Sequence, residues 1–151
     1  MRTLLFLGLL VSTLLFCPPS SHGSQTEHAK ETPAEQKEIR EAFQQVLQWL
    51  NQIDENKYEA SWDNASSYFK KIVPKKKWVT EIRAVRKPLG RAISRRERSH
   101  RKLTGIPGAP NGIYIVFQID TQFQSKPQAI ETVTPVKSKD GKWRVTGYYV
   151  K

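Results

Sequence analysis

The chemically most distinctive stretch of this sequence is its basic segment, residues 70–102. It holds fourteen lysines and arginines but only two acidic residues, Glu81 and Glu97, in a chain whose net charge is +11. Clustered ammonium and guanidinium groups attract carboxylates, sulfates and phosphates. We therefore expect an anion-binding surface in this segment. Its candidate residues are Lys75, Lys76, Lys77, Arg91, Arg95, Arg96, Arg98 and Arg101.

Three of these cations fall at the start of a predicted helix. Lys75, Lys76 and Lys77 occupy the first turn of a helix that begins at Pro74. Positive charge at this end opposes the helix dipole. A bound anion would reverse that cost, because free backbone N–H groups and three ammonium groups would converge on it.

The arginines fall on a predicted charged strand, residues 91–103. Strict alternation along a strand places Arg91, Arg95 and Arg101 on one face. The opposite face then carries Arg96, Arg98 and Lys102. Charge on both faces is typical of an edge strand, where it also prevents sheets from pairing with one another. A solvated edge of this kind is the alternative to anion binding.

Catalytic signatures are sparse in this sequence. His28 and His100 are the histidines that follow the first 23 residues, and neither is accompanied by a Ser-His-acid pattern or by metal-ligand spacing. We therefore predict no catalytic residue, no metal and no cofactor. The alternative is an isomerase or dehydratase in which Asp120 or Asp63 works with a tyrosine in a pocket at the mouth of the sheet. The candidate tyrosines are Tyr58 and Tyr114.

Large aromatic side chains are frequent for a domain of this size. We expect most of them to lie in the core, because Trp62 and Trp78 fall on apolar faces of predicted helices. A ligand-binding concavity lined by aromatics is the alternative. The side chains concerned are Trp49, Trp62, Trp78, Trp143, Tyr148 and Tyr149.

The N-terminus has the layout of a secretory signal peptide. Arg2 is followed by an apolar run over residues 4–16, then by two prolines and small residues that fit a cleavage site after Gly23. We expect a periplasmic or secreted protein, with residues 24–31 as a flexible leader. The alternative is a lipoprotein anchored through Cys17, although Phe16 does not suit the residue position before a lipidated cysteine.

Export limits the partners that the basic segment could meet. Outside the cytoplasm we expect an anionic polymer, a lipid head group or an acidic protein. Aromatic residues are not interleaved with the basic run, which argues against a stacking site for single-stranded nucleic acid. A structural role, with the face of the sheet forming a homodimer, is a further alternative.

The remaining pattern predicts a single α+β domain over residues 32–151. Apolar residues recur at helical spacing first and at strand spacing afterwards. We therefore expect N-terminal helices packed on one face of a curved four-stranded antiparallel sheet. Helices are expected at 33–53, around 58–62 and at 74–86, and strands at 91–103, 113–123, 129–138 and 143–150.

Four segments carry a resemblance to a known family. They are residues 85–90 (VRKPLG), 103–112 (LTGIPGAPNG), 131–135 (ETVTP) and 140–150 (DGKWRVTGYYV). Over residues 38–151 the chain resembles the bacterial family catalogued as domain of unknown function 4019. The resemblance implies an exported bacterial protein with no assigned activity. The layout is also similar to the nuclear-transport-factor-2-like and cystatin-like folds, a likeness that does not fix function.

Overall fold

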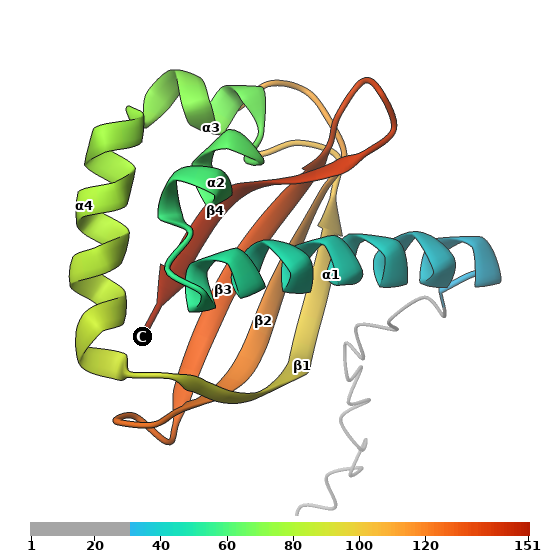
Figure 1. Ribbon diagram of the computed structural model, residues 1–151. Coiled ribbons are helices and arrows are strands. Elements are labelled where there is room, and N and C mark those ends of the chain that lie inside the picture. Colours follow the sequence, from blue (N-terminus) through green and yellow to red (C-terminus); the bar gives the residue numbers. More distant parts are fainter. Residues whose placement is uncertain (1–30) are drawn as a thin grey trace, which may run out of the picture. The chain divides into compact units, whose positions relative to one another are not determined.

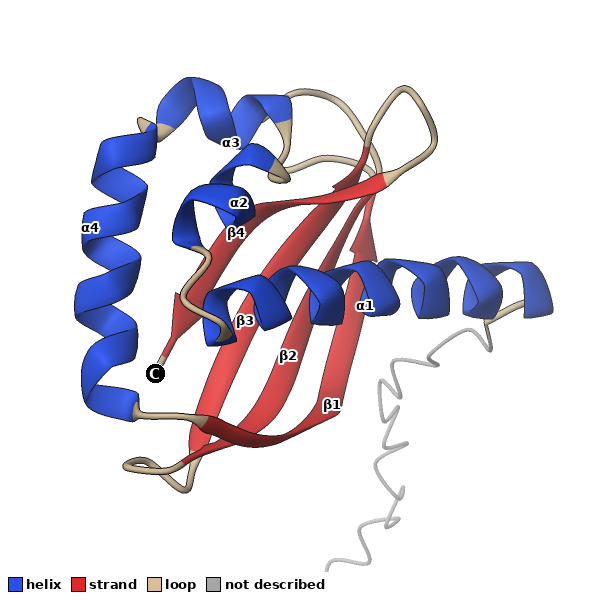
Figure 2. Cartoon of the chain, viewed as in Figure 1, coloured by secondary structure: helices blue, strands red, loops and turns tan. Residues whose placement is uncertain are grey.

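A computed structural model describes residues 31–151 of the chain. The predicted signal peptide, residues 1–23, and residues 24–30 of the predicted leader lie outside the described residues. One layer of helices covers one face of a four-stranded antiparallel sheet, and the other face of the sheet stays open (Figures 1 and 2). This confirms the predicted α+β architecture. Within residues 31–151, no helix is long and apolar enough to cross a membrane.

Helix α1 (Pro33–Asp54) crosses the sheet (Figure 1). Its start is fixed by a capping box, in which the Glu35 backbone N–H donates to Thr32 Oγ1 at 3.3 Å and Glu35 Oε2 accepts from the Thr32 backbone N–H at 2.9 Å. One stripe of the helix is buried against the sheet and includes Ala42, Val46 and Leu50. The predicted helix and its start are confirmed.

Three shorter helices and a turn of 3-10 helix follow. Their bounds are Tyr58–Asp63 for α2, Ser67–Ile72 for α3, Lys75–Arg86 for α4 and Lys87–Leu89 for η1. Helix α3 is not among the predicted helices. Ser66 is its N-cap, whose Oγ accepts from the Phe69 backbone N–H at 3.0 Å. The Ser66 backbone N–H also donates to the Val145 carbonyl of an edge strand at 2.9 Å.

The strands are β1 (Ala92–Leu103), β2 (Tyr114–Phe123), β3 (Ala129–Lys137) and β4 (Trp143–Val150), paired in that order. All four predicted strands are present within one or two residues of their expected bounds. The turn between β3 and β4 requires Gly141, whose φ is +79°, a conformation that side chains rarely adopt. Strand β1 is an edge strand, as predicted.

Strand β1 does not alternate strictly. The predicted assignment of its cations to two faces holds for Arg95 against Arg96 and Arg98 but is wrong for Arg101 and Lys102. Its pairing with β2 shifts between Ala92 and Ser94 and again between Glu97 and Ser99. Each shift adds a residue and reverses the order of faces beyond it. Arg95 and Lys102 therefore face the helices, whereas Arg101 lies on the open face of the sheet with Arg96. The register pairs Arg95 with Thr121, Arg96 with Asp120, Arg101 with Val116 and Lys102 with Ile115.

The core is built around an aromatic cluster. Trp49 and Trp78 have ring centroids 5.7 Å apart, and Trp78 also packs edge-on against Phe69 at 5.1 Å. The two indole N–H groups are both satisfied at Ser61, whose carbonyl accepts from Trp49 at 2.7 Å and whose Oγ accepts from Trp78 at 2.9 Å. The expectation of core aromatics is confirmed for these tryptophans and for Trp143, whereas Tyr149 is exposed.

Buried charge lies beside this core. Glu131 on β3 is 0% exposed and accepts hydrogen bonds from Arg95 at 2.6 Å, Thr121 at 2.6 Å and Tyr148 at 2.7 Å. Arg86, at the end of α4, lies 3.4 Å from the same carboxylate. Both arginines also pair with Asp54 at the end of α1. We call these groups the ion network; its members are Asp54, Arg86, Arg95, Thr121, Glu131 and Tyr148.

The ion network shifts the pKa values of Asp54 and Tyr148. Burial by itself raises the pKa of Asp54, but hydrogen bonds from Arg95 and Arg86 outweigh burial and hold that pKa below its ordinary value. Burial also raises the pKa of the Tyr148 hydroxyl far above its ordinary value, and the Glu131 carboxylate raises it further. The tyrosine is therefore neutral at all physiological pH values, and its hydroxyl donates a hydrogen bond to Glu131.

We expect Glu131→Ala to lower the free energy of unfolding by about 3–5 kcal/mol, because it leaves two buried guanidinium groups sharing one carboxylate. Urea denaturation measures the change. The matched control is Glu81→Ala, which removes an exposed carboxylate 3.8 Å from Lys77 and is expected to cost no more than about 0.5 kcal/mol. Equal losses in the two variants would contradict the assignment of Glu131 as the centre of the network.

A second cluster joins β1 to the start of the described chain. His100 Nδ1 lies 2.6 Å from Glu97, and its Nε2 lies 2.6 Å from Glu31, the last residue of the predicted leader. A protonated imidazole can donate to both carboxylates at once. Burial lowers the pKa of His100, but the hydrogen bonds to Glu31 and Glu97 outweigh burial and raise that pKa above 6.5.

Stability should therefore depend on pH through His100. Because the folded-state pKa is raised, the contribution of His100 is complete below pH 6.5 and is lost as the pH rises through the folded-state value. We expect the difference in free energy of unfolding between the wild-type protein and His100→Gln to be larger at about pH 5.5 than at about pH 8.5. Urea titrations at both pH values measure it, and a difference that grew toward alkaline pH would contradict the assignment.

Candidate anion-binding site

The open face of the sheet collects arginines from β1. Arg96 and Arg101 occupy open-face positions of the register, and the shift between Glu97 and Ser99 leaves Arg98 on the same face, where its Nε pairs with Asp120. We call Arg96, Arg98 and Arg101 the arginine face. All three side chains are exposed, so their guanidinium groups are available to a ligand.

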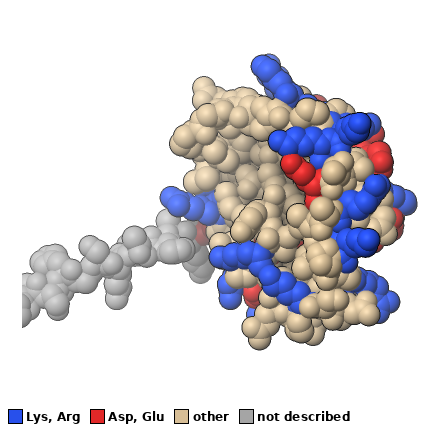
Figure 3. All heavy atoms as spheres, turned by 90° about the vertical axis from the view of Figure 1, so that its left-hand side faces the viewer, with Lys and Arg blue, Asp and Glu red and all other residues tan. Residues whose placement is uncertain are grey.

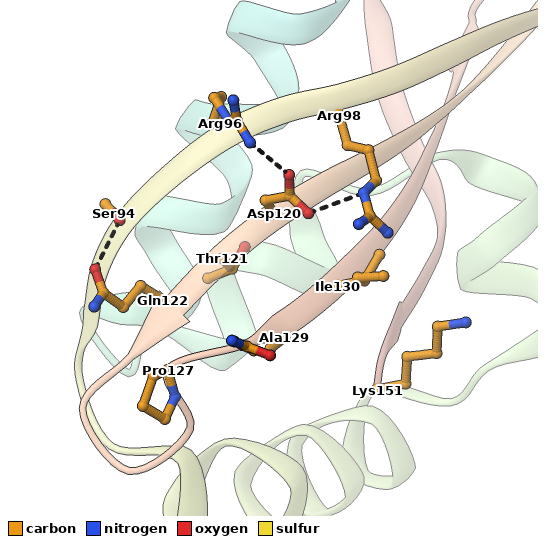
Figure 4. Close-up of a pocket in the computed structure, with 11 residues that line it drawn as sticks. Ser94, Arg96, Arg98, Asp120, Thr121, Gln122, Pro127, Ala129, Ile130 and Lys151 are labelled. Atoms are coloured by element: carbon orange, nitrogen blue, oxygen red, sulfur yellow. Dashed lines mark hydrogen bonds and ion pairs between the residues drawn. The ribbon is translucent and has the colours of Figure 1, made fainter.

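A cavity of about 480 Å³ lies beside two of these arginines. Figure 4 shows Arg96 and Arg98 reaching from β1 toward Asp120 on β2, with Lys151 on the far side of the cavity. The floor comes from the start of β3, at Ala129 and Ile130. The cavity is open to solvent.

One carboxylate serves two guanidinium groups at this site. Asp120 accepts from Arg96 at 3.2 Å and from Arg98 at 3.0 Å. The Arg96 side chain is 84% exposed, and that of Arg98 is 50% exposed. Exposed pairs of this kind are weak, so a ligand carboxylate or sulfate can replace Asp120 at either arginine.

Positive charge dominates the open face of the four strands. In the register of β1 to β4, Asp120 is the only acidic residue that falls on this face. The cations on the strands of this face are the arginine face and Arg144, which pairs with Asp140 of the neighbouring turn at 2.7 Å. Lys151, directly after β4, lines the cavity on the same face. The open face therefore keeps an excess of positive charge on the β1 side.

The predicted lysine group lies in the helical layer, away from the arginine face (Figure 1). Lys75 pairs with Asp63 at 2.6 Å, and Lys77 lies 3.8 Å from Glu81. Lys76 is exposed. Figure 3, which looks onto the α4 side, shows Lys and Arg in separate groups with uncharged surface and acidic side chains between them. The predicted basic segment is therefore not one continuous surface.

Two other predicted anion-binding residues have different surroundings. Arg95 belongs to the ion network, and only 12% of its side chain is exposed. Hydrogen bonds from its guanidinium group go to Asp54 and Glu131, so its charge is compensated inside the protein. Arg91 is exposed and lines a different cavity, between the ends of α1 and α4.

The residues of the enzymatic alternative have other partners. In residues 31–151, no hydrogen bond joins Asp63 or Asp120 to Tyr58 or Tyr114. Tyr58 donates to Asn56 at 2.6 Å, and Tyr114 donates to the Pro110 carbonyl. Both aspartates pair with basic side chains instead. The same residues contain no group of three His, Cys, Asp or Glu side chains that could hold a metal ion.

Sequence reasoning missed Asp54, Arg86, Glu131 and Tyr148 as a group. A signal for Glu131 was present, because it occupies an inward position of β3 between Ala129 and Val133, where an acid requires partners. For Arg86 the signal was the helical spacing of Trp78, Ile82 and Arg86, which extends the buried stripe of α4. Val85, the apolar residue next to Arg86, is exposed instead.

Comparison with known proteins gives a family without an assigned activity. The model of a family described as protein of unknown function (DUF4019) matches residues 45–148. No curated protein matches the chain. A 2.5 Å structure from Catenulispora acidiphila is similar over 78% of this chain and 93% of that chain, with 16% sequence identity and a TM-score of 0.45.

Proposed function

This chain belongs to the DUF4019 family, and we propose that it is a non-catalytic binding module that holds an acidic polysaccharide against the arginine face. The observation that carries the proposal is the shift in β1, which places Arg96, Arg98 and Arg101 on one face opposed by one carboxylate. Guanidinium groups present paired donors that match carboxylates and sulfates.

The spacing of the arginines suits an extended polymer. Side chains on one face of a strand recur about every 6–7 Å, so Arg96 to Arg101 spans about 16 Å along β1. A linear polymer with regularly repeated carboxylates or sulfates can contact all three guanidinium groups at once. A lipid surface is a poorer match, because the arginines stand over a strand and not over an amphipathic helix with large exposed apolar residues.

The proposed setting is the periplasm or the outside of the cell. It rests on the signal-peptide pattern of residues 1–23, and acidic polymers are accessible to a protein exported there. Homodimer formation through the open face is less favoured than polymer binding. Two copies stacked on this face would bring together surfaces of the same excess charge, which is destabilising without a bound anion.

Removing the arginine face should weaken binding to a sulfated polysaccharide more than removing the same charge elsewhere. We expect Arg96→Gln/Arg98→Gln/Arg101→Gln to elute from a heparin column at clearly lower salt than the wild-type protein. The matched control is Lys75→Gln/Lys76→Gln/Lys77→Gln, which removes equal charge from the helical layer and should stay near the wild-type elution position. Equal shifts in the two variants would show that retention depends on net charge alone, and would overturn the proposal.

Two further measurements separate the polymer from the other candidate partners. Retention on vesicles with anionic head groups that exceeded retention on heparin at the same salt would favour a lipid surface. Light scattering that showed a dimer dissociated by the arginine variant would favour self-association. Either result would contradict polysaccharide binding as the role of this face.

Asp120→Asn should strengthen binding to heparin. The change frees Arg96 and Arg98 from their internal carboxylate, and an exposed ion pair is worth up to about 1 kcal/mol, so we expect a gain in affinity of up to about 5-fold. Isothermal titration with a heparin oligosaccharide measures it. The control is Asp140→Asn, which removes a carboxylate beside Arg144 and should change the affinity less. A loss of affinity in Asp120→Asn would contradict the site.

A further inference from the structure

A second cavity lies in the helical layer, where α1 and α4 end. Its volume is about 490 Å³. Its walls come from the end of α1, the start of α2, the end of α4 and the link that leads into β1. None of its lining residues belongs to the arginine face, so it is independent of the site described above.

Three exposed cations line this cavity. They are Arg83 on α4, Lys87 on η1 and Arg91 before β1. None of them forms an ion pair with a carboxylate in residues 31–151. Arg83 lies over the ring of Tyr58, with 5.7 Å between its Cζ atom and the ring centroid, which holds one guanidinium group at the cavity wall.

The carboxylate that lines this cavity already has two ion-pair partners. Asp54 also lines the cavity, but Arg86 donates to its Oδ1 at 2.6 Å and Arg95 donates to its Oδ2 at 2.5 Å. The ion network thus compensates the charge of Asp54 from the interior side. The cavity is left with an excess of positive charge that the described residues do not neutralise.

Asn56 adds a neutral donor to the same wall. Its φ is +58°, a left-handed conformation that asparagine tolerates at the end of a helix. Its Oδ1 accepts the Tyr58 hydroxyl proton at 2.6 Å, so the Nδ2 group is the part of this amide left to meet a ligand. The wall therefore combines two guanidinium groups, one ammonium group and one amide donor.

The helix dipole accounts for only part of this arrangement. Cations near the C-terminus of a helix are favoured, which suffices to explain Arg83 and Lys87 at the end of α4. Arg91 lies beyond η1 and gains nothing from the dipole. Its presence in the same cavity is the observation that points to a ligand.

We propose that this cavity binds a small phosphate monoester, with Arg83 and Arg91 as the main contacts. A phosphate group carries close to two negative charges at neutral pH and three acceptor oxygens, which match two guanidinium forks and the Lys87 ammonium group. A single carboxylate would leave part of the positive charge unmatched. The cavity is large enough for a compact organic group beside the phosphate.

The test measures binding of inorganic phosphate and of phenyl phosphate by isothermal titration, at constant ionic strength set with sodium chloride. We expect each of Arg83→Gln and Arg91→Gln to raise the dissociation constant of phenyl phosphate about tenfold, which corresponds to about 1.4 kcal/mol. The matched control is Lys71→Gln/Lys76→Gln, which removes two exposed cations outside the cavity and should leave the constant nearly unchanged.

Other outcomes overturn the assignment. Equal weakening by the control variant, or no binding of either phosphate probe, would show that the cavity is not a phosphate site. Binding of succinate as tight as that of phenyl phosphate would assign the cavity to dicarboxylates instead. Thermal unfolding without ligand checks that the arginine variants are folded, and added phosphate should raise the midpoint of the wild-type protein.

Polysaccharide binding by the arginine face and phosphate binding by this cavity can be contradicted independently of each other. The variant Arg96→Gln/Arg98→Gln/Arg101→Gln should keep its affinity for phenyl phosphate, because those residues lie on the open face of the sheet. A loss of phosphate binding in that variant would contradict the independence of the cavity. Retention on heparin that persisted without the arginine face would contradict the first proposal and leave the second intact.

Discussion

The structure depends on the buried carboxylate of Glu131. A charge that is withdrawn from water must be compensated by partners, because an unpaired carboxylate in the interior is too costly to keep. Its partners come from β1, β2, β4 and α4, and Asp54 extends the same network to α1. Satisfying Glu131 therefore requires every layer of the fold to be in place. The network also specifies which arginine faces inward on β1.

The two inward-facing arginines, Arg86 and Arg95, affect the surface as much as the core. Arg86 lies over Phe123, with 4.6 Å between its Cζ atom and the ring centroid, and its Nε is left without a hydrogen-bond partner in the described residues. With Arg86 and Arg95 committed to the interior, the cations that remain outside divide between the open face of the sheet and the helical layer. The shift after Glu97 then gathers Arg96, Arg98 and Arg101 on the open face. Strand β1, whose sequence is a run of charged residues, thus has one face that contributes to the interior and one face that a ligand can reach.

Most of the fold could be predicted from local patterns. The capping box at Thr32 and Glu35, the helical spacing behind α1 and α4, and the turn at Gly141 act within a few residues, so their effects are visible in the sequence. Helix α3 was not predicted, because a serine such as its N-cap, Ser66, is equally compatible with a loop. The site was harder to predict, since Arg95 and Arg96 are neighbours in the same basic run and only their cross-strand partners distinguish them. Thr121 lies opposite one, and Asp120 opposite the other.

The α+β layout, the number of strands and the concentration of positive charge in residues 70–102 can all be read from the sequence. These properties follow from composition and from side-chain periodicity. Which of those cations reach solvent, which pair with the protein's own carboxylates and which line the same cavity depends on the tertiary fold. A register shift in one strand moves side chains from the inner to the outer face of the sheet, and that shift depends on strands and helices far away in the chain. Charge is a property of a residue, whereas its availability to a partner is a property of the fold.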